Sequence, residues 1–263
     1  MQAHEIDYVI YGEEMQHIEI ELDPNESAIA ESGSFMMMED GVGMQTIFGD
    51  GSKQEGGLMG KLFSAGKRIL TGESLFMTAF TNNGQGKKKV NFASPYPGKI
   101  IPLNLAQLNG KIICQKDAFL CAAKGVSIGI EFQRKLGTGL FGGEGFIMQK
   151  LEGDGMAFVH AGGHVFEKKL NPGEVLKIDT GCVVAYTYDV DFDIQFIGGI
   201  KNVVFGGEGL FFATLRGPGT VWIQSLPISR LASRVMSYGG FGRRKEEGGL
   251  LGGLGNLLDG DGR

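Results

Sequence analysis

Several features that would assign the chain to a familiar class are absent from its 263 residues. No apolar run approaches the roughly 20 residues that a membrane-spanning helix requires. Residues 1–14 carry acidic side chains and lack the apolar core of a secretory signal. The sequence therefore predicts a cytoplasmic protein without a spanning helix.

Cysteine and positive charge are both scarce. Cys114, Cys121 and Cys182 lie in apolar runs, and their odd number and wide separation predict reduced, buried thiols. A disulfide or a metal cluster is the alternative that these cysteines leave open. The formal net charge is −5, whereas nucleic-acid-binding proteins usually have a basic balance, so a nucleic-acid partner is not expected.

Glycine, in contrast, is abundant. The 45 glycines are more than twice the usual share, which is about 7%. Many lie in turn-like contexts, and some belong to a phrase that returns: Phe-Gly-Gly-Glu-Gly at 141–145 and 205–209, with a looser copy at 70–75. Apolar residues, a glycine-containing turn and a second apolar run follow each glutamate. This repetition predicts one β-rich unit that is used three times.

A second motif supports the same repeat. Leu-Asp-Pro-Asn-Glu at 22–26 and Leu-Asn-Pro-Gly-Glu at 170–174 begin two stretches that match without a gap, and a middle copy begins at Leu108 with one residue deleted. Short alternating segments between glycine and proline turns predict strands, the first of them from Ile6 to Glu21. We expect one all-β domain at 1–236, with units at about 3–95, 96–160 and 161–226 and a C-terminal helix. A disordered, glycine-rich tail should follow at 237–263.

Two segments break the β pattern and predict short peripheral helices. After Pro227, the spacing of Ile228, Leu231 and Val235 predicts the terminal helix. Residues 52–70 place apolar side chains at helical spacing beside basic ones, which predicts an amphipathic helix. Such a helix either caps an open end of the β body or contacts a membrane or protein partner. The contact residues would be Leu58, Lys61, Leu62, Phe63, Lys67 and Arg68.

Three motifs together carry a family resemblance. They are Leu-Asn-Pro-Gly-Glu at 170–174, Gly-Gly-Glu-Gly at 206–209 and Gly-Pro-Gly-Thr-Val-Trp at 217–222, followed by Gln224 and Ser225. The combination resembles an uncharacterised prokaryotic family related to the mitochondrial altered-inheritance-of-mitochondria proteins, over nearly the whole chain up to about residue 236.

That resemblance implies a fold, an assembly and a location. The implied fold is like that of the tryptophan RNA-binding attenuation protein, an all-β fold related to the double-stranded β-helix. The implied assembly is a ring-like homotrimer. Because mitochondrial relatives are implicated in inner-membrane organisation, contact with the inner face of a membrane is implied as well. No catalytic or binding motif of the family carries over to this chain.

The repeated glutamates Glu73, Glu144 and Glu208 are the first candidate site. Three repeats around an axis could gather three carboxylates into a cation site. Alternatively, each glutamate accepts hydrogen bonds from the amides of its own glycine turn. We favour this structural role, because a residue present in every copy is more often needed for the turn than for one asymmetric reaction.

The histidines His160 and His164 are the second candidate site. Only Ala-Gly-Gly separates them, so they should face each other across a hairpin. A metal would need a third ligand, and no such residue accompanies the pair at ligand spacing. We therefore expect structural histidines at these positions and predict neither a metal nor a cofactor.

These observations favour a non-enzymatic oligomeric scaffold or interaction protein, peripheral to a membrane. The alternative is a β protein or enzyme that binds a small ligand or metal in a cavity of the β body. A third possibility, RNA binding, would need a basic rim repeated in each unit. Lysines at 87–89 occur in only one of the three equivalent hairpins.

Overall fold

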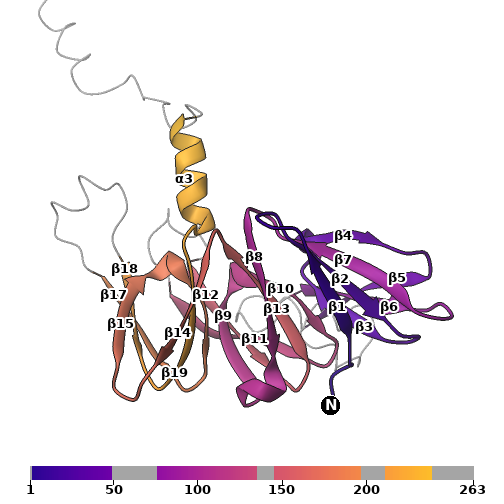
Figure 1. Cartoon of the computed structure of the whole chain (residues 1–263), viewed down its shortest axis with the longest axis horizontal. Helices are drawn as coiled ribbons and strands as arrows, with labels where there is room; N and C mark the ends of the chain where they lie inside the picture. The colour runs from indigo at the N-terminus through magenta and orange to yellow at the C-terminus, as the bar shows by residue number, and fades with distance from the viewer. Residues whose placement is uncertain (1, 49–75, 135–144, 197–210, 239–263) are drawn as a thin grey trace, which may run out of the picture. The chain divides into compact units, whose positions relative to one another are not determined.

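The computed structural model describes residues 2–48, 76–134, 145–196 and 211–238 (Figure 1). Within these ranges the protein is built mostly of strands, so the predicted all-β class is confirmed. The strands are β1 (Asp7–Tyr11), β2 (His17–Leu22), β3 (Ser27–Ala30), β4 (Phe35–Met38), β5 (Val42–Phe48), β6 (Phe76–Asn82), β7 (Lys88–Ala93), β8 (Gly98–Asn104), β9 (Lys111–Gln115), β10 (Phe119–Ala123), β11 (Ser127–Arg134), β12 (Phe146–Glu152), β13 (Met156–Gly162), β14 (Val165–Leu170), β15 (Val175–Asp179), β16 (Val183–Thr187), β17 (Asp191–Phe196), β18 (Phe211–Arg216) and β19 (Gly219–Gln224).

Short helices lie between some of the strands and after the last one. The 3₁₀ turns are η1 (Ser32–Ser34), η2 (Leu105–Leu108), η3 (Lys116–Ala118) and η4 (Thr180–Cys182). The helix that the sequence predicts after Pro227 is present as α3 (Ile228–Tyr238). The amphipathic segment 52–70 and the tail beyond residue 238 lie outside the described residues, so both remain predictions.

The chain divides into two compact units, 1–229 and 230–263. All strands of the described residues belong to the first unit, where they form two six-stranded sheets, one four-stranded sheet and one three-stranded sheet. The strand orders are β1-β2-β7-β4, β5-β6-β3-β10-β13-β8, β11-β12-β9-β16-β19-β14 and β15-β18-β17. Every pairing between these strands is antiparallel.

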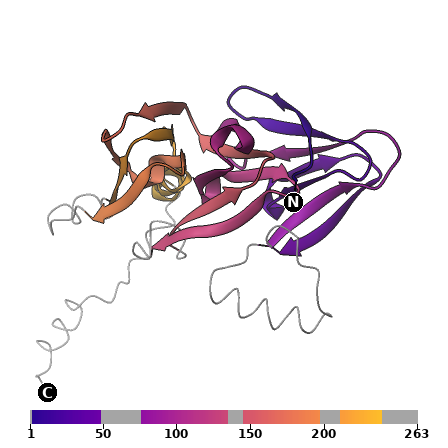
Figure 2. The ribbon, with the colours of Figure 1, turned by 90° about the horizontal axis from the view of Figure 1, so that it is seen from below.

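The pairings recur along the chain. We call β2–β7, β8–β13 and β14–β19 the first, second and third series, each of six strands. In every series the first and third strands pair with the sixth, and the second and fourth pair with the fifth. The second strand of one series also pairs with the third strand of the next, as β3 with β10 and β9 with β16. The series lie side by side in chain order, from indigo to orange (Figure 2).

A β-bulge marks the same position in each series. The third strand shifts register against the sixth between Phe35 and Met37, between Phe119 and Cys121, and between Val183 and Ala185. Because a bulge inserts one extra residue and bends the strand, it fixes the register on both sides of it. Phe35, Phe119 and Val183 are therefore counterparts, and residues can be compared from one series to the next.

Two turns that share a sequence motif also share a geometry. Asn25 and Gly173 hold equivalent places after the turn proline, and both have positive φ, 69° and 77°. Asparagine and glycine are the residues that tolerate this conformation best. In each turn the following glutamate accepts a hydrogen bond from the amide three residues before it: Glu26 from Asp23 at 2.8 Å and Glu174 from Asn171 at 3.0 Å.

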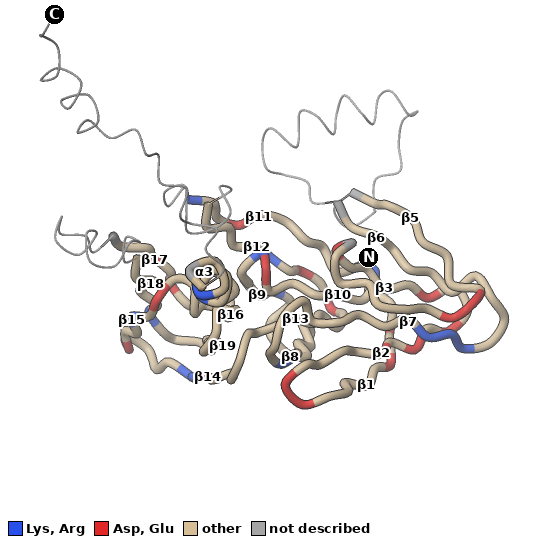
Figure 3. The backbone as a smooth tube through the Cα atoms, turned by 90° about the horizontal axis from the view of Figure 1, so that it is seen from above, with Lys and Arg blue, Asp and Glu red and all other residues tan. Residues whose placement is uncertain are grey.

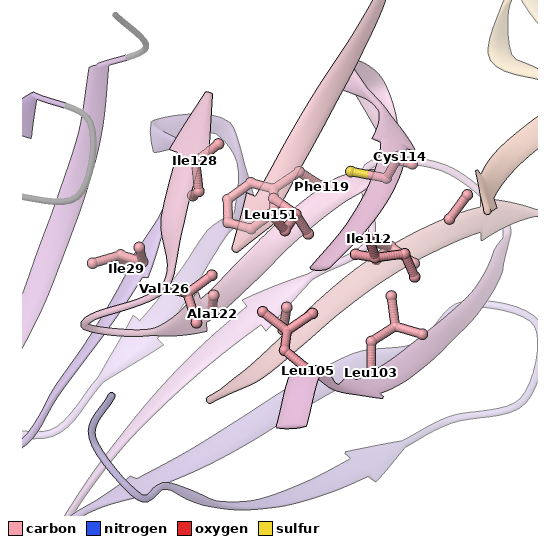
Figure 4. Packing of buried hydrophobic residues seen from close by; sticks show 14 of the residues in the cluster. Ile29, Leu103, Leu105, Ile112, Cys114, Phe119, Ala122, Val126, Ile128 and Leu151 are labelled. Carbon is pink, nitrogen blue, oxygen red and sulfur yellow. The ribbon is translucent and has the colours of Figure 1, made fainter. Parts of the chain in front are cut away.

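The hydrophobic core joins the series to one another. One cluster of buried side chains includes Ile29 of the first series, Leu151 of the second and Trp222 of the third. Figure 4 shows part of this cluster, with Phe119 and Cys114 near Leu151. Of two further clusters, one is built mainly from the first and second series and the other from the second and third series. The strands thus bury their apolar faces against neighbouring series.

The expected single strand from Ile6 to Glu21 is wrong. The chain instead forms β1 and β2, which pair with each other in a register that sets Tyr11 opposite His17. Gly12 has φ +89°, and a Cβ there would meet the Met15 carbonyl oxygen, so the chain turns where only glycine fits. Gly-Glu-Glu at 12–14 interrupts the apolar residues on either side, so the sequence did contain a signal for this turn.

Candidate functional site

Two of the predicted sites fall outside the described residues. The glutamates Glu73, Glu144 and Glu208 lie there, as do the six contact residues between 58 and 68. Their roles remain predictions.

The two candidate histidines do not come together. His160 is in β13, which pairs with β8 and β10, whereas His164 immediately precedes β14, which pairs with β19. The expected hairpin between them is therefore wrong. His160 is buried and His164 is exposed, and the amide of His164 donates to the Ser225 hydroxyl at 2.9 Å. In the described ranges, no three potential metal-ligating side chains cluster.

His160 has the properties of a core residue. Its ring lies edge-on to Tyr96, with ring centroids 4.4 Å apart, and neither ring nitrogen has a hydrogen-bond partner of good geometry. Burial lowers the pKa of His160 to about 4, and the nearby Tyr96 backbone opposes this effect only in part. At neutral pH the imidazole is therefore uncharged.

The cysteines also lie in the fold without forming disulfides. Cys114 and Cys121 are buried, as the sequence predicts, whereas Cys182 is only half-buried. Burial raises the pKa of both the Cys114 and the Cys121 thiol, because the thiolate would lose its hydration. Since the thiolate is the nucleophilic form, these two side chains are unreactive at neutral pH.

The lysine run at 87–89 is largely balanced by acids. Lys87 Nζ lies 2.6 Å from a Glu21 carboxylate oxygen, and Lys89 Nζ lies 2.6 Å from one of Glu19. Figure 3 shows this basic run next to acidic positions of the neighbouring chain. Such pairing reduces the positive potential that a nucleic-acid backbone would need.

One hollow lies between the second and third series. It has a volume of about 460 Å³. Its walls combine aromatic, acidic and aliphatic side chains: Ile113, Glu131, Phe132, Tyr186, Tyr188, Asp189, Val190, Asp191 and Phe192. Tyr186 and Phe192 stack with centroids 5.1 Å apart, and the Lys111 ammonium lies 3.6 Å above the Tyr188 ring. The Tyr188 ring, which is part of the wall, therefore already carries one ammonium group on its face.

The most unusual exposed surface is the edge strand β4. Phe35 is 36% exposed, Met36 and Met37 are each 49% exposed, and Met38 is 38% exposed. The counterpart strands β10 and β16 are buried almost throughout, because β3 and β9 pair with them. β4 has no strand on that side within the described part of the chain. Apolar residues on an unpaired edge form a template for another strand.

The strand β15 forms a second unpaired edge of the described sheets, in the third series. β15 is the third-series counterpart of β3 and β9, and it pairs only with β18 among the described strands. Val175 and Lys177 are exposed, and the rest of the strand is half-buried. By contrast, β3 is buried throughout, and in β9 only the first residue is not.

Composition alone does not identify these two edges. An apolar run such as Phe35–Met38 is typical of a core strand, and its composition alone does not reveal that its neighbour is missing. The repeat does contain a signal. The third strand of each series pairs with the second strand of the preceding series, and among the described strands the first series has no predecessor. Likewise, the second strand of the third series has no following series to pair with in the described ranges.

Comparison with known proteins gives three results. The family model described as mitochondrial biogenesis AIM24 matches residues 8–226. An uncharacterized protein of Streptococcus pyogenes serotype M6 is 32% identical over 225 residues, which cover 84% of this chain and 86% of that protein. A crystal structure of a Streptococcus pyogenes protein is similar with a TM-score of 0.70 and 26% identity, covering 89% of this chain and 99% of the other.

These matches agree with the motifs and the fold. The family model begins within β1 and ends two residues after β19, so it spans all three series. In the described ranges, the only α-helix is α3, and it does not have the length and apolar character needed to cross a bilayer. The chain belongs to the AIM24 family.

Proposed function

We propose that the protein is a non-enzymatic oligomeric scaffold that self-associates through its exposed sheet edges. One observation carries this proposal. The residues of β4 are exposed, whereas their counterparts in β10 and β16 are buried by a neighbouring strand. Since the two counterpart strands are covered by a neighbouring strand and β4, within the described residues, is not, the apolar surface of β4 is suited to a protein contact.

The proposal extends to the place where the scaffold acts. The basic and apolar side chains expected at 57–70 would add a surface for the inner face of a membrane, in the cytoplasm. Each basic residue near an anionic surface contributes only about 1 kcal/mol, so several linked copies would bind where one copy would not. A ring of three copies is the assembly that the family resemblance implies.

Light scattering coupled to size-exclusion chromatography tests the self-association. At micromolar concentration we expect a particle that is a multiple of the chain mass, 28.2 kDa. Dilution should shift the distribution toward smaller species, because the association is an equilibrium. A single species of chain mass throughout the micromolar range would overturn the proposal.

A second candidate function has one observation in its favour, the aromatic and acidic hollow beside Tyr188. A hollow of this size is within the usual range for small-ligand sites, and aromatic faces with nearby carboxylates attract organic cations. Calorimetric titration with tetramethylammonium tests this candidate. Phe192→Ala should abolish any heat of binding, whereas Phe166→Ala, at an exposed aromatic on β14, should leave it unchanged.

A further inference from the structure

The first and last sheets are incomplete, and each contains what the other lacks. Each six-stranded sheet joins two halves: the fourth, fifth and second strands of one series, such as β5-β6-β3, and the third, sixth and first strands of the next, such as β10-β13-β8. The three-stranded sheet β15-β18-β17 contains only the second, fifth and fourth strands of the third series. The four-stranded sheet β1-β2-β7-β4 contains β1 and only the first, sixth and third strands of the first series. Joining β15 to β4 would reproduce the six-strand order, with β1 as an additional edge strand.

The register of such a junction can be taken from the two junctions within the chain. Ala30 lies opposite Cys121 where β3 meets β10, and Cys114 lies opposite Ala185 where β9 meets β16. Both pairs have the same position relative to the bulge and the 3₁₀ turn. The corresponding residues at the free edges are Ile178 and Met37.

We propose that β15 of one copy pairs antiparallel with β4 of a second copy, with Ile178 opposite Met37 and Lys177 opposite Met38. This inference rests on the proposed self-association and names its interface. The occupant is a second copy of this chain because one chain presents both halves of the sheet. Main-chain pairing along the strands supplies the contact, as in other cases of strand addition to a sheet edge.

The two edges of one chain are not positioned to pair with each other. β4 lies at one end of the first unit and β15 at the other, on opposite sides of Figure 1. β4 belongs to the four-stranded sheet of the first series and β15 to the three-stranded sheet of the third series, and the two six-stranded sheets connect these series through the second. An intermolecular contact is therefore the way to complete both half-sheets.

The side chains of the two edges suit this contact. Methionine is flexible and polarisable, so Met36, Met37 and Met38 can adapt to a facing strand and bury apolar surface. Val175 is 50% exposed and Lys177 carries a long aliphatic stem, so both can cover methionine side chains. The Lys177 ammonium can remain in water at the rim.

The resulting contact is head-to-tail. Each copy uses β15 toward one neighbour and β4 toward another, so the two surfaces at the contact differ. Heterologous contacts of this kind close into a ring or continue as a filament, depending on the rotation between copies. The number of copies follows from that rotation.

The test introduces a like-charge pair at one predicted contact between the two strands and then makes that pair complementary. Met38→Lys sets a lysine opposite Lys177 of the next copy, and like charges directly opposite each other destabilise a strand pair. We expect self-association to weaken at least about tenfold, a free-energy change of about 1.4 kcal/mol. Adding Lys177→Glu to the same chain makes the pair complementary and should restore association. The matched control is Met44→Lys, at an exposed methionine of the edge strand β5, which should change nothing.

The outcomes separate this inference from the proposed function. Sedimentation velocity gives the dissociation constants, and circular dichroism verifies that each variant is folded. If the wild-type chain stays at chain mass, the proposed function fails and this inference fails with it. If the wild-type chain associates but Met38→Lys has no effect, or the double variant is no better than Met38→Lys alone, the register is wrong and self-association stands.

Discussion

The buried imidazole of His160 makes the stability of the protein depend on pH. In the unfolded chain the pKa of a histidine is about 6.5, whereas burial lowers the pKa of His160 to about 4 in the folded protein. Because the unfolded chain binds the proton more readily, stability is intact above about pH 6.5 and is lost as the pH falls toward 4. The full effect is about 3 kcal/mol, since one pKa unit corresponds to 1.36 kcal/mol.

The expected loss at a practical pH follows from the same linkage. Between pH 7.5 and pH 5.0, His160 should account for about 2 kcal/mol of lost unfolding free energy. We propose to replace it by Gln, which removes the titrating group. Gln224 occupies the matching place in β19 and is itself buried, so the fold has a precedent for that side chain.

Urea titration with fluorescence detection measures this difference. The single tryptophan, Trp222, is 5% exposed and donates to Glu167 at 3.0 Å, so its emission should change on unfolding. At one fixed protein concentration, wild type should lose about 2 kcal/mol more than His160→Gln between the two pH values. His164→Gln is the matched control, because that histidine is exposed, and it should behave like wild type. Equal losses in wild type and His160→Gln would refute the assignment of a buried neutral imidazole.

Two further predictions concern the fold and the membrane contact. Asn82 is fully buried and donates to the carbonyl oxygens of Leu22 and Gly86 at 2.9 and 2.8 Å, so Asn82→Leu should cost about 3 kcal/mol of unfolding free energy in the same urea assay. An unchanged midpoint would contradict the importance of these bonds. In liposome flotation, wild type should rise with anionic vesicles, and the double variant Leu62→Glu/Phe63→Glu should remain at the bottom. Failure of both proteins to float would exclude the membrane contact.

The sequence is sufficient for features that depend on neighbouring residues. Proline at 24 and 172 followed by Asn25 or Gly173 predicts a turn, and the turn forms there with positive φ. Alternation of apolar residues predicts the all-β class, because period-two patterning suits a strand with one buried face. The terminal helix after Pro227 follows from its own periodicity.

Features that depend on distant pairing could not be predicted in this way. His160 and His164 are close in sequence, but their strands join different sheets, so proximity along the chain suggested a hairpin that does not exist. The apolar character of Phe35–Met38 gives no information on whether a strand covers it. That depends on long-range partners, which are available to β10 and β16 but not to β4.

The run of three exposed methionines in β4 also makes this edge sensitive to oxidants. Oxidation converts a thioether into a polar, chiral sulfoxide, which is poorly suited to an apolar contact. In an assembled copy the facing strand would shield Met36, Met37 and Met38, whereas a free copy exposes all three. Oxidative damage would therefore accumulate on unassembled copies and prevent them from joining, until methionine sulfoxide reductases restored the thioethers.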